Sequence, residues 1–330
     1  MLIHAWPLRV RWLLLPTLLS LAAVAPAMVL AQVARVEVIP FQTTTLTDQE
    51  FLVGKREGKP ATIAGELRIP TPGTARLPAV VLVHGSGGIG ASVEDWVPLL
   101  NGAGAVTFVI DSFTGRGLVD VRNDQSQLGR LAGVVDVYRA LELLAKHPRI
   151  DPRRIAVMGF SRGGQAALYA SLKRFQRMHG PADAAFAVYV PFYADCTTTY
   201  IDDDDVTNKP IRMFHGIADD WNPVAPCRSY VERLRKGGKD VVLTEYADAQ
   251  HVFDGATLKV PMKLERAQTV RHCRLREVEG GRIVNGQTGK EFTYDDPCVE
   301  RGTTIGFNAQ ARAEAQKAVQ EIVATLASAK

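Results

Sequence analysis

The sequence has few cysteines and no strong compositional bias. Only four of its 330 residues are cysteine, 22% are charged and 46% are hydrophobic. These are the proportions of an ordinary globular chain, which excludes disordered, collagenous and fibrous classes. We find no internal repeat and no long linker, so we expect a single large domain. The length is ample to bury a sizeable core.

A strong charge of one sign is also missing. The formal net charge is +4, and it falls to +2 when the two arginines of the N-terminal segment 1–31 are removed. So weak a positive field does not indicate nucleic acid as a partner. The acidic run at 202–205 lacks the spaced ligands of an EF-hand, so we expect a solvated loop there. No metal and no organic cofactor is expected.

Long apolar runs are absent after residue 31. Before it, two arginines precede a nearly unbroken apolar run over 12–31 that ends in small and branched residues. This pattern predicts a secretory signal peptide over 1–31. An uncleaved membrane anchor is the competing interpretation, because about 20 apolar residues can span a bilayer. Two prolines and the Ala-rich end favour cleavage, so we expect a periplasmic or secreted protein with no membrane segment after cleavage.

The rest of the chain alternates short apolar runs with segments of helical periodicity. Apolar residues recur at intervals of three and four over 128–144, and helices are also expected over 227–236 and 307–327. Runs that are apolar on both faces are typical of a parallel sheet covered on each side. The sequence therefore predicts a doubly wound α/β domain over 32–330. The expected strands are 78–83, 105–110, 155–158, 186–190, 211–214 and 241–246.

One region interrupts this alternation. About 50 residues, at 256–305, separate the last expected strand from the final helix. Within them, Arg282–Asn285 and Glu291–Tyr294 flank a Gln-Thr-Gly turn and predict a small hairpin. We interpret the region as an excursion from the domain rather than a second domain.

The four cysteines predict two disulfides, because an even number suits an oxidising compartment and their spacing matches no zinc signature. Cys196 and Cys227 follow consecutive strands, which usually lie side by side, so we expect them to pair. Cys273 and Cys298 bracket the hairpin and would close it at its base.

The strongest functional motif is Gly-Phe-Ser-Arg-Gly-Gly at 159–164, between an expected strand and an Ala-rich helix. That context is what a nucleophile elbow requires, so Ser161 is the candidate nucleophile. A serine hydroxyl needs a histidine base, and the base needs a carboxylate that fixes its tautomer. The chain supplies Asp219 and then His251, each just beyond an expected strand. Asp220 and His272 are the alternatives.

An oxyanion requires two hydrogen-bond donors. The backbone N–H of Arg162 follows the nucleophile, and the N–H of Ser86 lies in a Gly-rich loop after the strand that ends near His84. We predict these two amides as the oxyanion hole. Arg116 and Trp221 are candidates to line the substrate pocket.

Five segments resemble the dienelactone hydrolase family. They are HGSGG at 84–88, DSFTGRG at 111–117, GFSRGG at 159–164, HGIADDWNP at 215–223 and QHVF at 250–253. The resemblance implies an α/β-hydrolase fold, and it assigns the acid to Asp219 rather than Asp220. The family's namesakes have a cysteine nucleophile where this chain has Ser161, which points to a broader esterase activity in an exported branch of the family.

The sequence thus predicts a serine hydrolase that cleaves a small carboxylic ester or lactone through an acyl-enzyme. A serine peptidase of related fold is one alternative, because the same residues can cleave amides. A non-catalytic binding protein on a hydrolase scaffold is the other, and an ester hydrolysis assay separates it from an enzyme.

Overall fold

The computed structural model describes residues 1–2 and 33–328. The predicted signal peptide over 1–31 therefore lies almost entirely outside the described residues. Within the described part of the chain, no helix is both long enough and apolar enough to cross a membrane.

An eight-stranded sheet forms the centre of the unit that begins at Ala31, in the order β1-β2-β4-β3-β5-β6-β8-β9. The six strands from β4 to β9 are parallel, while β1 pairs with β2 and β2 with β4 in antiparallel fashion. Each of the six predicted strands is present, and the sequence missed β1 and β2. The strands of this sheet are β1 Arg35–Thr45, β2 Lys59–Ile69, β3 Leu77–Val83, β4 Val106–Asp111, β5 Ile150–Phe160, β6 Val188–Phe192, β8 Ile211–Gly216 and β9 Val241–Tyr246.

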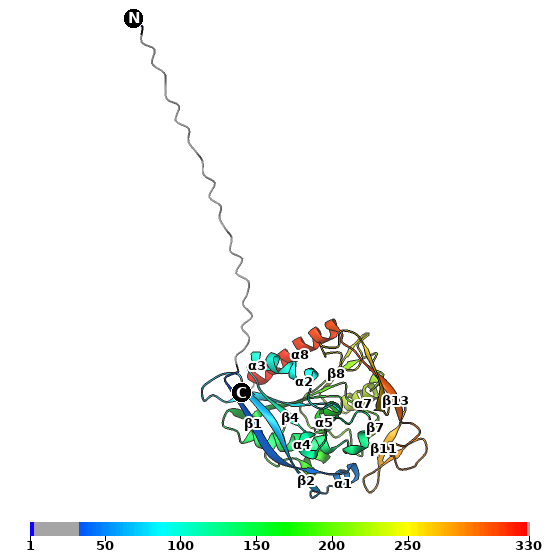
Figure 1. Cartoon of the computed structure of the whole chain (residues 1–330). Helices are drawn as coiled ribbons and strands as arrows, with labels where there is room; N and C mark the ends of the chain where they lie inside the picture. Colours follow the sequence, from blue (N-terminus) through cyan, green and yellow to red (C-terminus); the bar gives the residue numbers. More distant parts are fainter. Residues whose placement is uncertain (3–32, 329–330) are drawn as a thin grey trace. The chain divides into compact units, whose positions relative to one another are not determined.

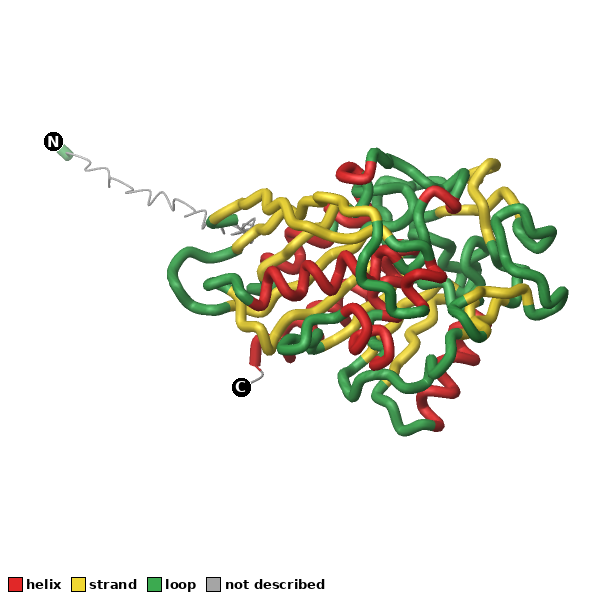
Figure 2. The backbone as a smooth tube through the Cα atoms, turned by 90° about the horizontal axis from the view of Figure 1, so that it is seen from below, coloured by secondary structure: helices red, strands yellow, loops and turns green. Residues whose placement is uncertain are grey.

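Helices cover both faces of the sheet, as the apolar strands require (Figure 1). One apolar cluster joins one face to α4, α5 and α7, and a second cluster joins the other face to α3 and α8. The helices run alongside the strands in Figure 2. They are α1 Asp48–Leu52, α2 Ala91–Glu94, α3 Trp96–Gly102, α4 Ala132–Ala145, α5 Arg162–Tyr169, α6 Lys173–His179, α7 Val224–Lys236 and α8 Ala309–Ser328, with short 3-10 turns η1 Thr114–Arg116 and η2 Gln125–Gln127.

The excursion contains two small antiparallel ladders. β10 (Met262–Thr269) pairs with β13 (Glu300–Ile305), and β11 (Leu275–Val278) pairs with β12 (Arg282–Asn285). β11 also lies parallel to β7 (Thr198–Thr199), which attaches the excursion to the loop after β6 (Figure 1).

The hairpin predicted around Gln-Thr-Gly is reduced to one isolated bridge, between Val284 and Glu291. The main partner of β12 is instead the preceding strand, β11. The turn between them contains Gly280 and Gly281, with φ of +78° and +70°. Only glycine adopts that left-handed backbone readily, so the chain reverses there. It also reverses at the predicted turn, where the Phe292 N–H donates to the Ile283 carbonyl oxygen at 2.8 Å.

The structure pairs Cys196 with Cys227 and Cys273 with Cys298, with Cα–Cα distances of 5.1 and 5.0 Å. The first bond lies where β6 and β8 are neighbours in the sheet, as the sequence argument required. The second closes the base of the segment that contains β11 and β12.

We predict that non-reducing peptide mapping of protein expressed into the periplasm will recover these two cross-linked peptide pairs. In the chain-entropy model, each bond stabilises the fold by about 3–4 kcal/mol, because the bonds close loops of 31 and 25 residues. The double variant Cys273→Ala/Cys298→Ala should lose roughly that much unfolding free energy while keeping the other bond. Free thiols, or a peptide joining Cys196 to Cys273 or Cys298, would contradict the pairing.

Candidate active site

Ser161 occupies a sharp turn between β5 and α5. Its φ is +56°, a conformation that costs strain in a non-glycine residue. A Cβ atom on Gly159 would collide with the Gly163 carbonyl oxygen, and one on Gly163 would collide with the Val83 carbonyl oxygen. The two glycines therefore let strand and helix approach closely enough to hold the serine above the end of the sheet.

The three residues predicted as a catalytic triad come together in space. His251 Nε2 lies 3.0 Å from Ser161 Oγ, and His251 Nδ1 lies 2.7 Å from Asp219 Oδ2. Asp219 follows β8 and His251 follows β9, so the ends of three parallel strands supply the three side chains. Asp219 is 4% exposed and His251 1%, which removes competing water from the bond between them.

The environment of Asp219 keeps its carboxylate charged. Its Oδ1 atom accepts hydrogen bonds from the backbone N–H groups of Trp221, at 2.9 Å, and Asn222, at 2.8 Å. Burial by itself raises the pKa of Asp219, but the charge of His251 and hydrogen bonds from His215 and His251 outweigh burial and hold the pKa well below its ordinary value. A charged carboxylate on Nδ1 leaves His251 Nε2 free to accept a proton from Ser161.

His215 is a neighbour of Asp219 to which the sequence analysis gave no role. Its Nε2 atom lies 2.7 Å from the Asn222 carbonyl oxygen, to which it can donate, and 3.5 Å from Asp219 Oδ2. The His215 ring, which belongs to β8, therefore stabilises the turn 219–222. Its place in the His-Gly-Ile-Ala-Asp segment, four residues before the acid, was the available signal.

The two alternative site residues lie elsewhere. The Asp220 carboxylate accepts hydrogen bonds from the backbone N–H of Thr304, at 2.7 Å, and from its hydroxyl, at 3.0 Å. The His272 side chain is 65% exposed and its nearest acid is Glu300, at 3.6 Å. Neither alternative reaches Ser161.

Two aromatic rings pack against His251. The Tyr193 ring centroid lies 4.7 Å from that of His251, and the Trp221 ring lies 4.9 Å away. The Tyr193 hydroxyl donates to the buried Asp254, which also accepts from the Trp96 indole N–H. Both aromatic rings therefore restrict the imidazole to the plane in which it meets Ser161. The sequence analysis did not identify Tyr193 or Asp254.

Ser86 and Arg162, the predicted oxyanion donors, both lie near Ser161. Arg162 is the first residue of α5, where an N–H has no acceptor within the helix. Ser86 lies in the loop after β3, and its carbonyl oxygen accepts from the Val121 N–H at 2.8 Å. Both residues border a cavity that includes Ser161.

His84 fixes the loop that carries Ser86. The Ser112 N–H donates to His84 Nε2 at 3.2 Å, so the proton must be on Nδ1, which donates to the Gly85 carbonyl oxygen at 2.8 Å. Burial lowers the pKa of His84, which keeps the ring neutral and this tautomer in place.

The Arg162 side chain is a buried cation that contacts only neutral acceptors. Its guanidinium donates to the Leu128 carbonyl oxygen at 2.9 Å and to both oxygens of Gln125 at 3.1–3.2 Å, and it lies 3.4 Å from Ser86 Oγ. Burial lowers its pKa. This positive charge has no acidic hydrogen-bond partner among the described residues, and it lies next to the hydroxyl of Ser86, so it favours negative charge nearby. The sequence analysis assigned only the backbone of this residue.

Arg116 does not line the substrate cavity, which corrects that prediction. Its guanidinium forms a bidentate pair with the Asp136 carboxylate, with both N–O distances at 2.8 Å, and the Asp136 side chain is fully buried. The pair joins η1 to α4, and further bonds to Thr45 and to the Ser112 carbonyl oxygen bring four of the five guanidinium N–H groups into use. Trp221, the other predicted pocket residue, does border the cavity.

The cavity above Ser161 has a volume of about 220 Å³. Glycines of the 85–90 loop form one wall, and apolar side chains form most of the rest. Arg122 is the one arginine, lysine or acidic side chain that borders the cavity among the described residues, and Asp120 pairs with it. The apolar walls are those of Phe160, Tyr193, Trp221, Val252, Leu258, Leu264 and Ile305.

The fold and the strand order define an α/β hydrolase, in which the serine follows β5, the acid follows β8 and the histidine follows β9. The chain also matches the model of the dienelactone hydrolase family over residues 65–270. The protein belongs to the dienelactone hydrolase family.

Two curated relatives match part of the chain, at 30% and 27% identity. The probable carboxylic ester hydrolase LipM of Mycobacterium tuberculosis is 30% identical over 163 residues, which cover 37% of this chain and 38% of LipM. The chain therefore spans well under half of that relative. A probable 2-oxo-3-(5-oxofuran-2-ylidene)propanoate lactonase of Bradyrhizobium is 27% identical over 199 residues, which cover 54% of this chain and 75% of the lactonase.

Solved structures share the fold at low identity. The structure named m3DLH aligns with a TM-score of 0.57 and 17% identity, covering 89% of this chain and 99% of its own. The dienelactone hydrolase-like promiscuous phosphotriesterase P91 from metagenomic libraries aligns with a TM-score of 0.54 and 15% identity, covering 88% of this chain and 98% of its own.

Proposed function

We propose that this protein is an exported serine hydrolase that cleaves small carboxylic esters or lactones through an acyl-enzyme. The observation that carries the proposal is the continuous line of contacts from Ser161 Oγ through His251 to Asp219. The names of the two sequence relatives, an ester hydrolase and a lactonase, support the same substrate class.

In the proposed reaction His251 Nε2 takes the proton of Ser161 while Oγ attacks the ester carbonyl carbon. The carbonyl oxygen becomes an oxyanion between the N–H groups of Ser86 and Arg162. His251 then returns the proton to the departing alcohol, and the acyl group remains on Ser161. A water molecule, deprotonated by His251, attacks the acyl carbon and releases the acid. Asp219 stabilises the charged form of His251 in both halves of the cycle.

Export is part of the proposal. The predicted signal peptide lies outside the described residues, but the two disulfides support an oxidising compartment, because such bonds are rare where thiols are kept reduced.

The size of the cavity predicts a preference for short acyl groups. At about 220 Å³ with mostly apolar walls, it suits a small ester better than a long-chain one. We expect p-nitrophenyl acetate and butyrate to be hydrolysed, with kcat/KM lower by roughly tenfold or more for the octanoate, since a chain that does not fit loses binding in the transition state.

The same assay separates the alternatives. If none of the three esters is hydrolysed faster than in buffer alone, the result favours the binding-protein interpretation. Faster release of p-nitroaniline from the matching acyl anilides than of p-nitrophenol from the esters would favour the peptidase.

A further inference from the structure

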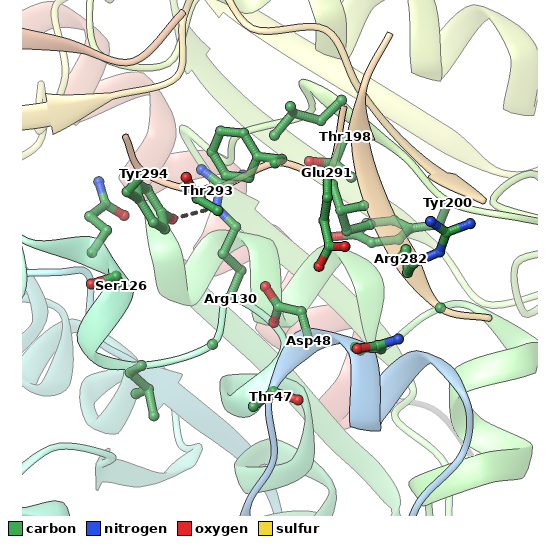
Figure 3. Close-up of a pocket in the computed structure, with 18 residues that line it drawn as sticks. Thr47, Asp48, Ser126, Arg130, Thr198, Tyr200, Arg282, Glu291, Thr293 and Tyr294 are labelled. Carbon is green, nitrogen blue, oxygen red and sulfur yellow. Dashed lines mark hydrogen bonds between the residues drawn. The ribbon is translucent and has the colours of Figure 1, made fainter. Parts of the chain in front are cut away.

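A second cavity, of about 420 Å³, shares no lining residue with the 220 Å³ cavity above Ser161, and only Gln125 and Arg130 of its wall also border the small cavity beside Ser161 and Arg162. Its walls come from the start of α1, the segment 125–130, the β7 region and the excursion (Figure 3). The proposed catalytic cycle uses none of these side chains directly.

Both disulfides hold the walls of this cavity in place. Thr198 follows Cys196 by two residues, and Leu275 follows Cys273 by two. These two wall residues are also register partners in the pairing of β7 with β11. The cavity is therefore formed before any ligand arrives, which lowers the entropic cost of binding.

The floor of the cavity is buried and polar. Arg130 is 8% exposed, and Thr198 and Tyr200 are each 4% exposed. Arg130 donates to the Tyr294 hydroxyl at 2.9 Å, and its charge is matched by Asp195 at 3.0 Å. The Thr198 hydroxyl has no hydrogen-bond partner among the described residues. The Thr198 oxygen itself is enclosed, so the groups that a ligand can reach are those of the rim.

The rim of the cavity carries side chains of both charges, namely two carboxylates and a guanidinium group. Figure 3 shows the Asp48 and Glu291 carboxylates directed into the cavity from opposite walls, one from α1 and the other from the excursion. Arg282 stands on the excursion side of the same rim. An anionic ligand would meet the two carboxylates, and a dication would meet two guanidinium groups. A neutral ligand rich in hydroxyl groups can donate to the carboxylates and accept from the arginines.

Aromatic rings complete the lining. Tyr200, Phe292 and Tyr294 present apolar surface beside the polar groups, which suits the C–H face of a sugar ring. We propose that this cavity is a binding site for a neutral saccharide, of one or two sugar units, separate from the ester-hydrolysing site.

The test uses the full mature chain carrying Ser161→Ala, with saturation-transfer NMR and titration calorimetry. The probes are methyl glucoside, cellobiose, maltose and xylobiose, with putrescine and citrate as charged probes. We expect saturable binding of at least one neutral sugar and none of putrescine or citrate. Binding of a charged probe in place of every sugar, or no saturable binding of any sugar, would overturn the proposal.

Two variants locate the binding. Arg282→Ala removes an exposed guanidinium of the cavity rim, and Glu291→Ala removes an exposed carboxylate, so neither should impair folding. Each should weaken sugar binding by about tenfold, the loss expected for one hydrogen bond to a polar or charged group. Glu279→Ala is the matched control, because Glu279 is exposed on the same excursion outside the cavity lining. Sugar affinity that falls equally in the control, or in neither test variant, would place binding elsewhere. The binding experiment uses the Ser161→Ala variant, which is not expected to hydrolyse esters. Its result therefore does not depend on whether the parent protein is an esterase.

Discussion

Replacing Ser161 by alanine is expected to lower kcat for p-nitrophenyl acetate by about a million-fold, the typical loss when a serine nucleophile is removed. The reason is geometric, since Ser161 Oγ is the atom that faces His251 Nε2 at 3.0 Å. Stopped assays against a no-enzyme blank measure the loss. Folding should be unaffected, because alanine adds no atom to the turn, and the thermal unfolding midpoint serves as the control.

A variant that keeps more than about a tenth of the parent rate would contradict the assignment. Ser86 and Ser92 also line the same cavity, and Ser86→Ala is the matched comparison because Ser86 is the predicted oxyanion donor. We expect a far smaller effect there, because the proposal assigns Ser86 a backbone N–H and not its hydroxyl.

Asp219→Asn should lower kcat by roughly ten-thousand-fold with little change in fold. An asparagine oxygen can replace Oδ1 and accept the N–H groups of Trp221 and Asn222. Its NH₂ group would then face His251 Nδ1 and donate to it. That donation forces the proton onto Nε2, which can no longer accept one from Ser161.

Asp220→Asn is the control for this prediction. The Asp220 side chain bonds Thr304 and lies at the edge of the excursion, so turnover should stay within a few-fold of the parent. Steady-state kinetics of the two variants side by side give the ranking. A larger loss in Asp220→Asn would transfer the role of the acid to that residue.

Local patterns were sufficient to predict the parallel part of the sheet and the candidate site. Strands buried on both faces are continuous apolar runs, and the elbow motif carries its own strand and helix. The sequence analysis missed β1, which is an edge strand, and β2 beside it, because only one face of each strand is buried and Pro40 lies in the middle of β1.

The side-chain assignments that failed depend on partners distant in sequence. Arg116 was a reasonable pocket candidate until the structure placed it on Asp136, which lies 20 residues away on α4. Tyr193 and Asp254 were missed for a similar reason, because the two residues that form this hydrogen bond are 61 positions apart in the sequence. The Arg162 side chain reaches Gln125 and Leu128 in a segment that carries no motif of its own.

Labelling with a fluorophosphonate probe tests the central claim most directly, because the probe forms a stable bond to the oxygen of an activated serine. We predict one adduct per chain, located by tandem mass spectrometry on Ser161, with labelling abolished in Asp219→Asn and unchanged in Asp220→Asn. An adduct on Ser86 or any other serine, or no adduct in a chain that hydrolyses p-nitrophenyl acetate, would contradict the account.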